Sequence, residues 1–395
     1  MTARLLYVDV NASFGNPTRN LLPVALMKGC DVRFFGPGYV SSDVLAKGLP
    51  AFIDQYGPFD AAASNTLVLF SDESNPARYA KAVRASYAYE GASDDLLYLP
   101  IIAKQFSALS MPRIALLLEN DFYNWTAKER DRIDAAADFF IGFGQEFCPF
   151  IADMPRLKSE RFAAITTDIW AEFCRTNSHR VASLLHFVSD SEFSISPLAS
   201  RPDDWSVMGV QYHARQVARD VLLKADIMPV IDTRFRKLLF LLKKLRVVRG
   251  EKRLIQKLLN ADFMARIAAT RYSYTCGSAL DMPIRKFFEI PASGSVLVCR
   301  PFHGFKDAGF IDGKNCMIVE PEQIIDAHRS LLADPDLAQR LASSGQHLVM
   351  EKHSLDARSR HLASIVEAIA QGRFKGSHWM EGEHRLRTAA LGSAA

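Results

Sequence analysis

The chain has 395 residues, of which 49% are hydrophobic and 23% charged, and its formal net charge is +4. This length exceeds one ordinary core and suits two α/β domains of a globular protein. The mild charge argues against a dedicated nucleic-acid binder, and six cysteines without a CxxC pair argue against a disulfide framework or a zinc site. We see no signal-peptide pattern and no apolar run of membrane-spanning length, which predicts a cytoplasmic protein.

The first half of the chain alternates short apolar segments with helical patterns. A helix is predicted from Pro17 to Gly29, because proline suits the first turn of a helix and glycine its end. Such alternation predicts a parallel sheet with helices on both faces and ligands bound beyond the carboxyl ends of its strands. The predicted strands are 5–10, 32–35, 59–63, 114–118 and 139–143.

A domain boundary is predicted at 195–204, where proline, serine and charge replace the periodic pattern. The alternation then restarts, so we predict one Rossmann-like domain over 1–198 and a second over 199–372, with a ligand cleft between them. The tail over 373–395 is polar and aperiodic, which predicts a flexible segment. The second domain has predicted strands at 205–209, 227–230, 272–276, 296–299 and 317–319 and predicted helices at 211–224, 321–332 and 355–371.

The most informative segment is 275–294, which has the pattern of a strand end, a loop through Gly277 and Ser278, and a helix that stops at Gly294. Asp281 is predicted to cap this helix, with proline in the first turn. The amino end of a helix attracts anions, so a phosphate is expected at this position.

Charged residues on the same predicted helix strengthen this interpretation. Arg285 and Lys286 add positive charge near the expected phosphate. Glu289 lies among apolar residues, where a carboxylate needs hydrogen-bond donors such as a ribose diol. The structural alternative is that Asp281 only caps the helix, while Glu289 pairs with Arg285 or Lys286 one turn away.

The segment resembles a known signature. Asp281 and Glu289 are separated by seven residues and are followed by the run EIPASG, which is similar to the acidic-x7-Glu signature of retaining GT-B glycosyltransferases. A closer likeness is to the family that includes the spore maturation protein CgeB, in which the helix reads as an Arg/Lys-x-Phe-Glu run. Similar patterns follow at 310–319 and 353–358, and the likeness covers about 200–370.

The resemblance implies an α/β protein of the GT-B fold, with two doubly wound Rossmann-like domains that face a central cleft. It implies transfer of a sugar from a nucleotide-diphosphate sugar to a polysaccharide, glycolipid or other acceptor, with no cofactor and no essential metal. Glu289 would bind the ribose hydroxyls, Asp281 would lie near the transferred sugar, and Gly277 with Ser278 would approach the phosphates. The broader signature has Glu where this chain has Asp281, which leaves the role of that residue open.

A second set of candidate residues follows the first predicted strand of the second domain. Gly209 would permit close approach of the backbone to a ligand, and Arg215 would neutralise a leaving diphosphate. The resembled family has a similar arrangement of glycine, tyrosine and arginine, with Tyr212 as the tyrosine. The alternative is that Arg215 is solvated and that Tyr212 only packs.

Candidates for a catalytic base, which an inverting reaction would need, lie at predicted strand ends of the first domain. Glu119 and Asp121 follow one strand, and Asp9 and Asn11 follow another. The alternative is that these residues form turns or cap the helix near Thr126. The sequence leaves the choice between inversion and retention open.

The stretch 234–257 contains ten Lys or Arg residues, one acid and an apolar stripe. A basic amphipathic helix of this kind can lie on an anionic membrane, where lipid-linked acceptors are found. The favoured alternative is a helix that packs on the second sheet and exposes its basic face to solvent.

Two other functions compete with glycosyl transfer as interpretations of this sequence. A sugar-nucleotide epimerase on the same fold would need acids and a histidine around the sugar, with His186, His213 and His303 as candidates. A non-catalytic protein that binds a nucleotide sugar or a partner is the other rival, because a fold does not fix a function.

Overall fold

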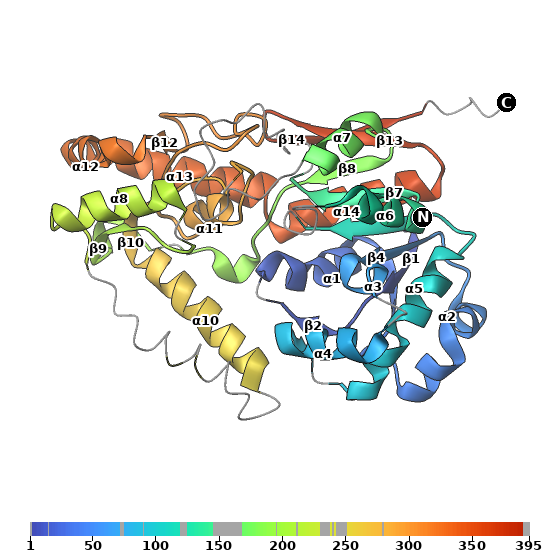
Figure 1. The fold of residues 1–395 in the computed structure, drawn as a ribbon. Helices are drawn as coiled ribbons and strands as arrows, with labels where there is room; N and C mark the ends of the chain where they lie inside the picture. Colours follow the sequence, from blue (N-terminus) through green and yellow to red (C-terminus); the bar gives the residue numbers. More distant parts are fainter. Residues whose placement is uncertain are drawn as a thin grey trace.

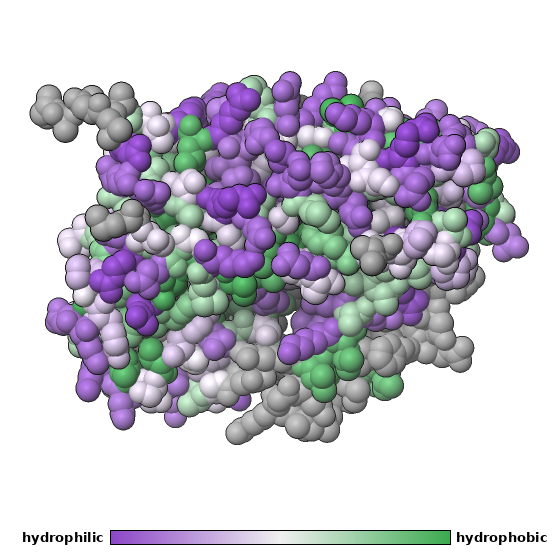
Figure 2. All heavy atoms as spheres, turned by 180° about the vertical axis from the view of Figure 1, so that it is seen from behind, coloured by the Kyte–Doolittle hydropathy of each residue, from purple (hydrophilic) through white to green (hydrophobic). Residues whose placement is uncertain are grey.

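The computed structural model describes residues 2–14, 16–71, 75–89, 91–118, 125–144, 168–194, 196–210, 212–229, 238, 241, 251–278 and 280–389. Two parallel sheets with flanking helices form two domains (Figure 1). The surface is hollowed between these domains when the molecule is viewed from behind (Figure 2). The predicted α/β class with two parallel sheets is therefore confirmed.

The first domain has a six-stranded sheet in which all neighbouring strands are parallel. Successive residues of its first strand, Arg4–Val8, enter opposite cores, since Leu6 and Val8 pack in one cluster and Leu5 and Tyr7 in the other. A sheet buried on both faces explains the near-continuous apolar runs in the sequence. The strand order is β3 (Asp31–Phe35), β1 (Arg4–Val8), β4 (Ala61–Asn65), β6 (Arg113–Leu117), β7 (Phe139–Phe143) and β8 (Val181–Leu184).

Helices connect these strands as the sequence predicted. The first helix has the predicted bounds, and Asn16 caps it by accepting a hydrogen bond from the backbone N–H of Thr18. The α-helices of this part are α1 (Pro17–Gly29), α2 (Ser42–Tyr56), α3 (Thr66–Leu69), α4 (Pro76–Ser86), α5 (Leu99–Ser107), α6 (Ala127–Ala136) and α7 (Asp168–Thr176), and a small antiparallel pair joins β2 (Ala12–Ser13) to β5 (Ala88–Tyr89).

The second domain has a four-stranded parallel sheet. The strand predicted at 227–230 is wrong over its described residues, 227–229, because the chain turns at Asp226 (φ +56°) and buries Met228 against the sheet and its helices. The strand order is β12 (Met317–Ile318), β11 (Val296–Cys299), β10 (Thr270–Thr275) and β9 (Asp203–Ser206), and the α-helices are α8 (His213–Lys224), α10 (Glu251–Ala268), α11 (Lys286–Ala292), α12 (Ile324–Ala333) and α13 (Pro335–Lys352).

The end of the chain returns to the first domain. Helix α14 (Leu355–Ala370) packs in the same core as Leu5 and Tyr7 of β1, so it does not belong to the second domain, to which its sequence position assigned it. The segment predicted to be a flexible tail instead forms an antiparallel hairpin of β13 (Phe374–Met380) and β14 (Glu383–Thr388). The indole Nε1 of Trp379 donates to the carbonyl of Ser183 on β8 at 2.8 Å, which holds the hairpin on the first sheet.

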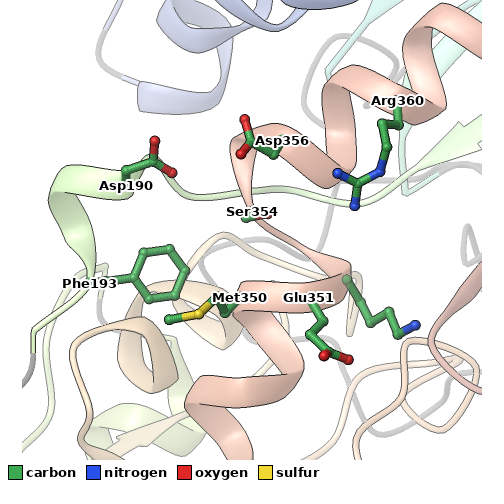
Figure 3. Close-up of a pocket in the computed structure, with 8 residues that line it drawn as sticks. Asp190, Phe193, Met350, Glu351, Ser354, Asp356 and Arg360 are labelled. Atoms are coloured by element: carbon green, nitrogen blue, oxygen red, sulfur yellow. The ribbon is translucent and has the colours of Figure 1, made fainter.

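Two segments carry the chain between the domains, and they pair with each other. The backbone N–H of Val188 donates to the carbonyl of His353 at 3.2 Å, and that of Leu355 donates to the carbonyl of Val188 at 2.8 Å. A pocket of about 610 Å³ lies beside this junction (Figure 3). It is lined by Asp190 and Phe193 from the first crossover and by Ser354 and Asp356 from the second (Figure 3).

Candidate functional site

Three of the predicted site residues meet just beyond the carboxyl end of β9. Gly209 has a φ of +100°, a conformation that favours glycine. A Cβ atom on Gly209 would lie 2.2 Å from Cε of Lys286 and 3.1 Å from Nη1 of Arg215. The glycine therefore leaves the space in which one residue of α11 and one residue of α8 come together.

Arg215 is buried and held in one position. Its exposed fraction is 1%, and its guanidinium lies over the ring of Tyr212 at 4.7 Å. Nη1 donates to the carbonyl of Val210 at 2.8 Å, and Nη2 donates to the carbonyl of Cys276 at 3.3 Å. These hydrogen bonds orient the guanidinium, but carbonyl oxygens do not neutralise its positive charge. The alternative of a solvated Arg215 is wrong, whereas Tyr212 does pack, against the guanidinium.

The loop after β10 is a tight turn built around Gly277 and Ser278. A Cβ atom on Gly277 would lie 2.7 Å from Cα of Asp281, so the loop needs glycine at that position. The backbone N–H of Ser278 donates to the carbonyl of Met282 at 3.0 Å, and that of Asp281 donates to the carbonyl of Ser278 at 3.0 Å. Asp281 itself has a φ of +52°.

The prediction that Asp281 caps the following helix is wrong. Helix α11 begins at Lys286 and has only seven residues. Asp281 instead belongs to the turn that begins at Ser278, and its φ of +52° lies outside the range of a right-handed helix. The positive groups at this site are therefore the side chains of Arg215 and Lys286 rather than the amino end of a long helix.

Asp281 is paired with Arg300. Nη2 of Arg300 lies 3.1 Å from Oδ1 of Asp281, whose side chain is 19% exposed. Burial raises the pKa of the Asp281 carboxyl, and Arg300 offsets only part of this rise. The backbone N–H of His303 donates to the carbonyl of Asp281 at 2.9 Å, which fixes the loop against the segment after β11.

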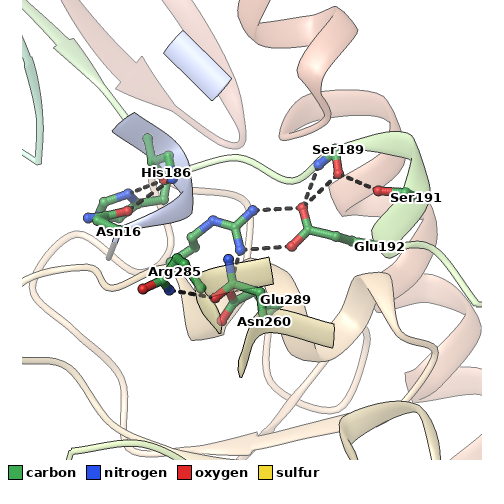
Figure 4. A network of polar contacts seen from close by, with 10 residues as sticks. Asn16, His186, Ser189, Ser191, Glu192, Asn260, Arg285 and Glu289 are labelled. Carbon is green, nitrogen blue, oxygen red and sulfur yellow. Dashed lines mark hydrogen bonds and ion pairs between the residues drawn. The ribbon is translucent and has the colours of Figure 1, made fainter. Parts of the chain in front are cut away.

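Glu289 belongs to a buried ion-pair network (Figure 4). Arg285 donates to Oε1 and Oε2 of Glu192 at 2.8 and 2.7 Å, and its Nη1 is also paired with Oε1 of Glu289. The i,i+4 pair that the structural alternative predicted is thus present. Burial lowers the pKa of Arg285, but the two carboxylates outweigh burial and raise it.

Glu192 is the residue of this network that the sequence prediction missed. Burial opposes ionisation of Glu192, but the charge of Arg285 and the donors of Ser189 outweigh it and lower the pKa of the carboxyl. The spacing Ser189-x-x-Glu192 is that of a capping box, which the structure contains. This spacing could have placed the acid at a turn, although it could not have placed it opposite Arg285.

The first domain contacts the candidate loop directly. A Cβ atom on Gly144, at the end of β7, would lie 3.3 Å from Cγ of Pro283, and Met282 packs in a core cluster of the first domain. Nδ1 of the buried His186, on the segment that leaves the first sheet, lies 2.9 Å from Oγ1 of Thr18 on α1. The candidate site therefore lies where the two domains meet.

The structure describes two of the four candidate bases of the first domain. Asp9 is buried, and it accepts hydrogen bonds from Tyr7 Oη at 2.7 Å and from the backbone of Val10 at 2.6 Å, which assigns it a structural role. Asn11 donates to the carbonyl of Gly38 at 3.1 Å. Glu119 and Asp121 lie outside the described residues, and the helix that follows is capped by Thr126 with Glu129.

The three histidines proposed for an epimerase have separate surroundings. His186 contacts Thr18, the backbone of His303 contacts Asp281, and His213 is exposed at the start of α8. Among the residues that the structure describes, no group of three or more His, Cys, Asp and Glu side chains is arranged to hold a metal ion. A hollow of about 1460 Å³ lies between the segment 301–318, which includes His303, and the side of α13.

Comparison with known proteins gives a consistent picture of the fold. A family model described as glycosyl transferase-like matches residues 238–364, about a third of the chain. HepE from Anabaena, solved with UDP and glucose, is similar over 92% of this chain and 99% of its own, with 12% identity and a TM-score of 0.50. A glycosyltransferase from Rickettsia africae is similar over 93% of this chain and 98% of its own, with 14% identity and a TM-score of 0.50. No curated protein matches the chain. The fold is therefore GT-B, as the sequence resemblance implied.

Proposed function

We propose that the protein transfers a glycosyl group from a nucleotide-diphosphate sugar to an acceptor. The observation that carries this proposal is the meeting of Arg215 and Lys286 at Gly209, beyond the strand ends of a GT-B fold. In glycosyl transfer the bond between the sugar and the diphosphate breaks through an oxocarbenium-like state. Fixed positive groups beside the departing diphosphate lower that barrier.

We propose roles for the other residues of the candidate site as well. Glu289 would accept hydrogen bonds from the ribose hydroxyls, in addition to the contact that its Oε1 makes with Arg285. Asp281, on the loop that contacts both domains, would lie near the transferred sugar. Gly277 and Ser278 form the turn that brings the backbone toward the phosphates.

The donor and the acceptor can be proposed more specifically. HepE was solved with UDP and glucose, so UDP-glucose is the first donor to test. The run from Arg285 to Glu289 supports the narrower likeness to the CgeB family. We propose a glycan or lipid-linked acceptor and a cytoplasmic location.

We also propose that the reaction needs neither a metal nor a cofactor. Arg215 and Lys286 supply positive charge at the position where a divalent ion would otherwise neutralise the diphosphate. Activity is expected to persist in EDTA, and a loss that Mg²⁺ or Mn²⁺ restores would contradict this.

Contact with a membrane surface is proposed for the region of the basic stretch 234–257, most of which lies outside the described residues. No helix in the described part of the chain is both long and apolar enough to span a bilayer. On α10, however, Leu254 is 55% exposed and Leu258 is 40% exposed. Sedimentation with phosphatidylglycerol vesicles but not with phosphatidylcholine vesicles is expected, and equal recovery in both would contradict the proposal.

The central experiment measures donor binding and donor hydrolysis by the purified protein. UDP-, GDP-, dTDP- and CMP-sugars are tested by thermal shift and by release of the nucleotide. At least one donor should raise the melting temperature and be hydrolysed slowly. A donor that binds without turnover would indicate a non-catalytic binding protein, and no binding to any donor would overturn the proposal.

A further inference from the structure

We propose that Glu192, on the crossover between the domains, is a positioning residue that sets the affinity of the site for ribose. It would act through Arg285 on Glu289 and touch no part of the donor itself. This inference rests on the proposed function, because it assumes that Glu289 receives the ribose.

Glu192 is held in position by Ser189, which precedes it in the same crossover. Its Oε2 accepts hydrogen bonds from the backbone N–H of Ser189 at 2.7 Å and from the hydroxyl of Ser189 at 3.0 Å. The side chain is buried, and both of its oxygens face the guanidinium of Arg285 (Figure 4). A bidentate pair of this kind fixes the plane of the guanidinium as well as its position.

The segment that follows Glu192 is fastened to the end of α11. The backbone N–H of Ser194 donates to the carbonyl of Ala292 at 3.1 Å, and Nε2 of Gln346 donates to the carbonyl of Ser194 at 2.7 Å. Glu192 is therefore fixed relative to the helix that carries Glu289. The crossover from Ser189 onward is part of the second domain rather than a loose connection.

The charges of the network explain how Glu192 could affect a ligand that binds to Glu289. One guanidinium faces two carboxylates, and its Nη1 is shared between Oε1 of Glu192 and Oε1 of Glu289. Among the residues that the structure describes, Glu289 has only this one shared donor, so its carboxyl oxygens can accept further hydrogen bonds from ribose hydroxyls. Without the charge of Glu192, Arg285 would turn its whole fork to Glu289 and compete with the ribose.

The test compares a ribonucleotide with its 2′-deoxy counterpart. Isothermal titration with UDP and with 2′-deoxy-UDP gives the ribose preference of the wild type. In Glu192→Gln we expect UDP to bind about tenfold more weakly, the effect of disturbing one charge-assisted hydrogen bond. Binding of 2′-deoxy-UDP should change little, so the preference should collapse.

The matched control is Glu172→Gln, the same substitution in the exposed ion pair of Glu172 with Arg175. It should leave both affinities unchanged. Where Glu192→Gln does not fold, Arg285→Lys replaces it, because an ammonium cannot hold both carboxylates in the same fixed plane. GDP and 2′-deoxy-GDP replace the uridine pair if the wild type binds only guanine nucleotides.

The outcomes separate this inference from the proposed function. A wild type that binds no nucleotide overturns the proposed function and the inference together. A wild type that prefers the ribonucleotide, with a Glu192→Gln variant that keeps the full preference, overturns only the inference. Equal weakening of both nucleotides would show that Glu192 has a purely structural role, which also overturns it.

Discussion

Lys286 occupies the space that a side chain on Gly209 would need, since a Cβ atom there would lie 2.2 Å from its Cε. The same Cβ position lies 3.1 Å from Nη1 of Arg215. The two cationic side chains come from two helices, α11 and α8, and the absence of a side chain at Gly209 lets them approach. The proposed binding of a diphosphate rests on this arrangement of two cationic side chains.

Gly209→Ala is expected to weaken donor binding by about tenfold or more, because the methyl group displaces Lys286. It should also destabilise the fold by about 1–3 kcal/mol, because alanine disfavours a φ of +100°. Titration with UDP and urea unfolding measure the two effects. Gly313→Ala is the control, since Gly313 has a φ of +70° and nothing within 4 Å of its Cβ position. Equal affinity in both variants would contradict the prediction.

Arg215→Met should lower kcat by about 100-fold, because the buried guanidinium stabilises charge that develops on the leaving diphosphate. KM should change less, since the effect is larger in the transition state than in the ground state. Steady-state kinetics with the best donor measure both constants. Arg219→Met, one turn later on α8 and partly exposed, is the control. A variant that raises KM while kcat stays constant would assign Arg215 to ground-state binding only.

Glu289→Ala should abolish donor binding in a protein that still folds, because Arg285 retains Glu192 as its partner. Circular dichroism and thermal unfolding report the fold, and titration reports the affinity per folded molecule. Glu172→Ala serves as the exposed control. If the variant unfolds while its folded fraction binds the donor normally, Glu289 is a structural residue.

Asp281→Asn should raise stability at neutral pH while it lowers activity. The pKa of Asp281 is raised in the folded protein, so the folded state binds its proton more tightly than the unfolded state does. The wild type therefore loses stability as the pH rises from the unfolded pKa to the folded pKa, and the full penalty is present above that window. The gain in the variant should appear at neutral pH and vanish in acid below both values. Urea unfolding at a series of pH values tests this, and an unchanged or lower stability of the variant at pH 7 would contradict it.

Features set by neighbouring residues could be predicted from the sequence. The bounds of α1 followed from Pro17 and Gly29, and five of the six strands of the first sheet followed from their apolar runs, whereas β8 was not predicted. The closeness of Gly209 and Arg215 could be predicted, because they lie only six positions apart in one connection between a strand and a helix.

Features set by contacts between distant residues could not be predicted. Glu192 and Arg285 are 93 positions apart, and no local pattern joins them. The hairpin at the end of the chain has a polar composition, and its order depends on burying Trp379 against a strand of the first sheet. The predicted start of α11 was wrong, because Ser278 and Asp281 form a turn of their own. The residues that resembled a helix cap belong to that turn.

The return of α14 to the first domain has a consequence for biosynthesis. The face of the first sheet that includes Leu5 and Tyr7 is covered in part by α14, which is synthesised after the strands of both parallel sheets. At usual rates of synthesis, roughly ten to thirty seconds pass between residue 198 and residue 370, and the part of this face that α14 covers stays exposed meanwhile. The first half of the chain therefore cannot complete its fold as an independent unit. A chain cut after residue 354 should aggregate, and a soluble monomer in sedimentation velocity would show that α14 is dispensable.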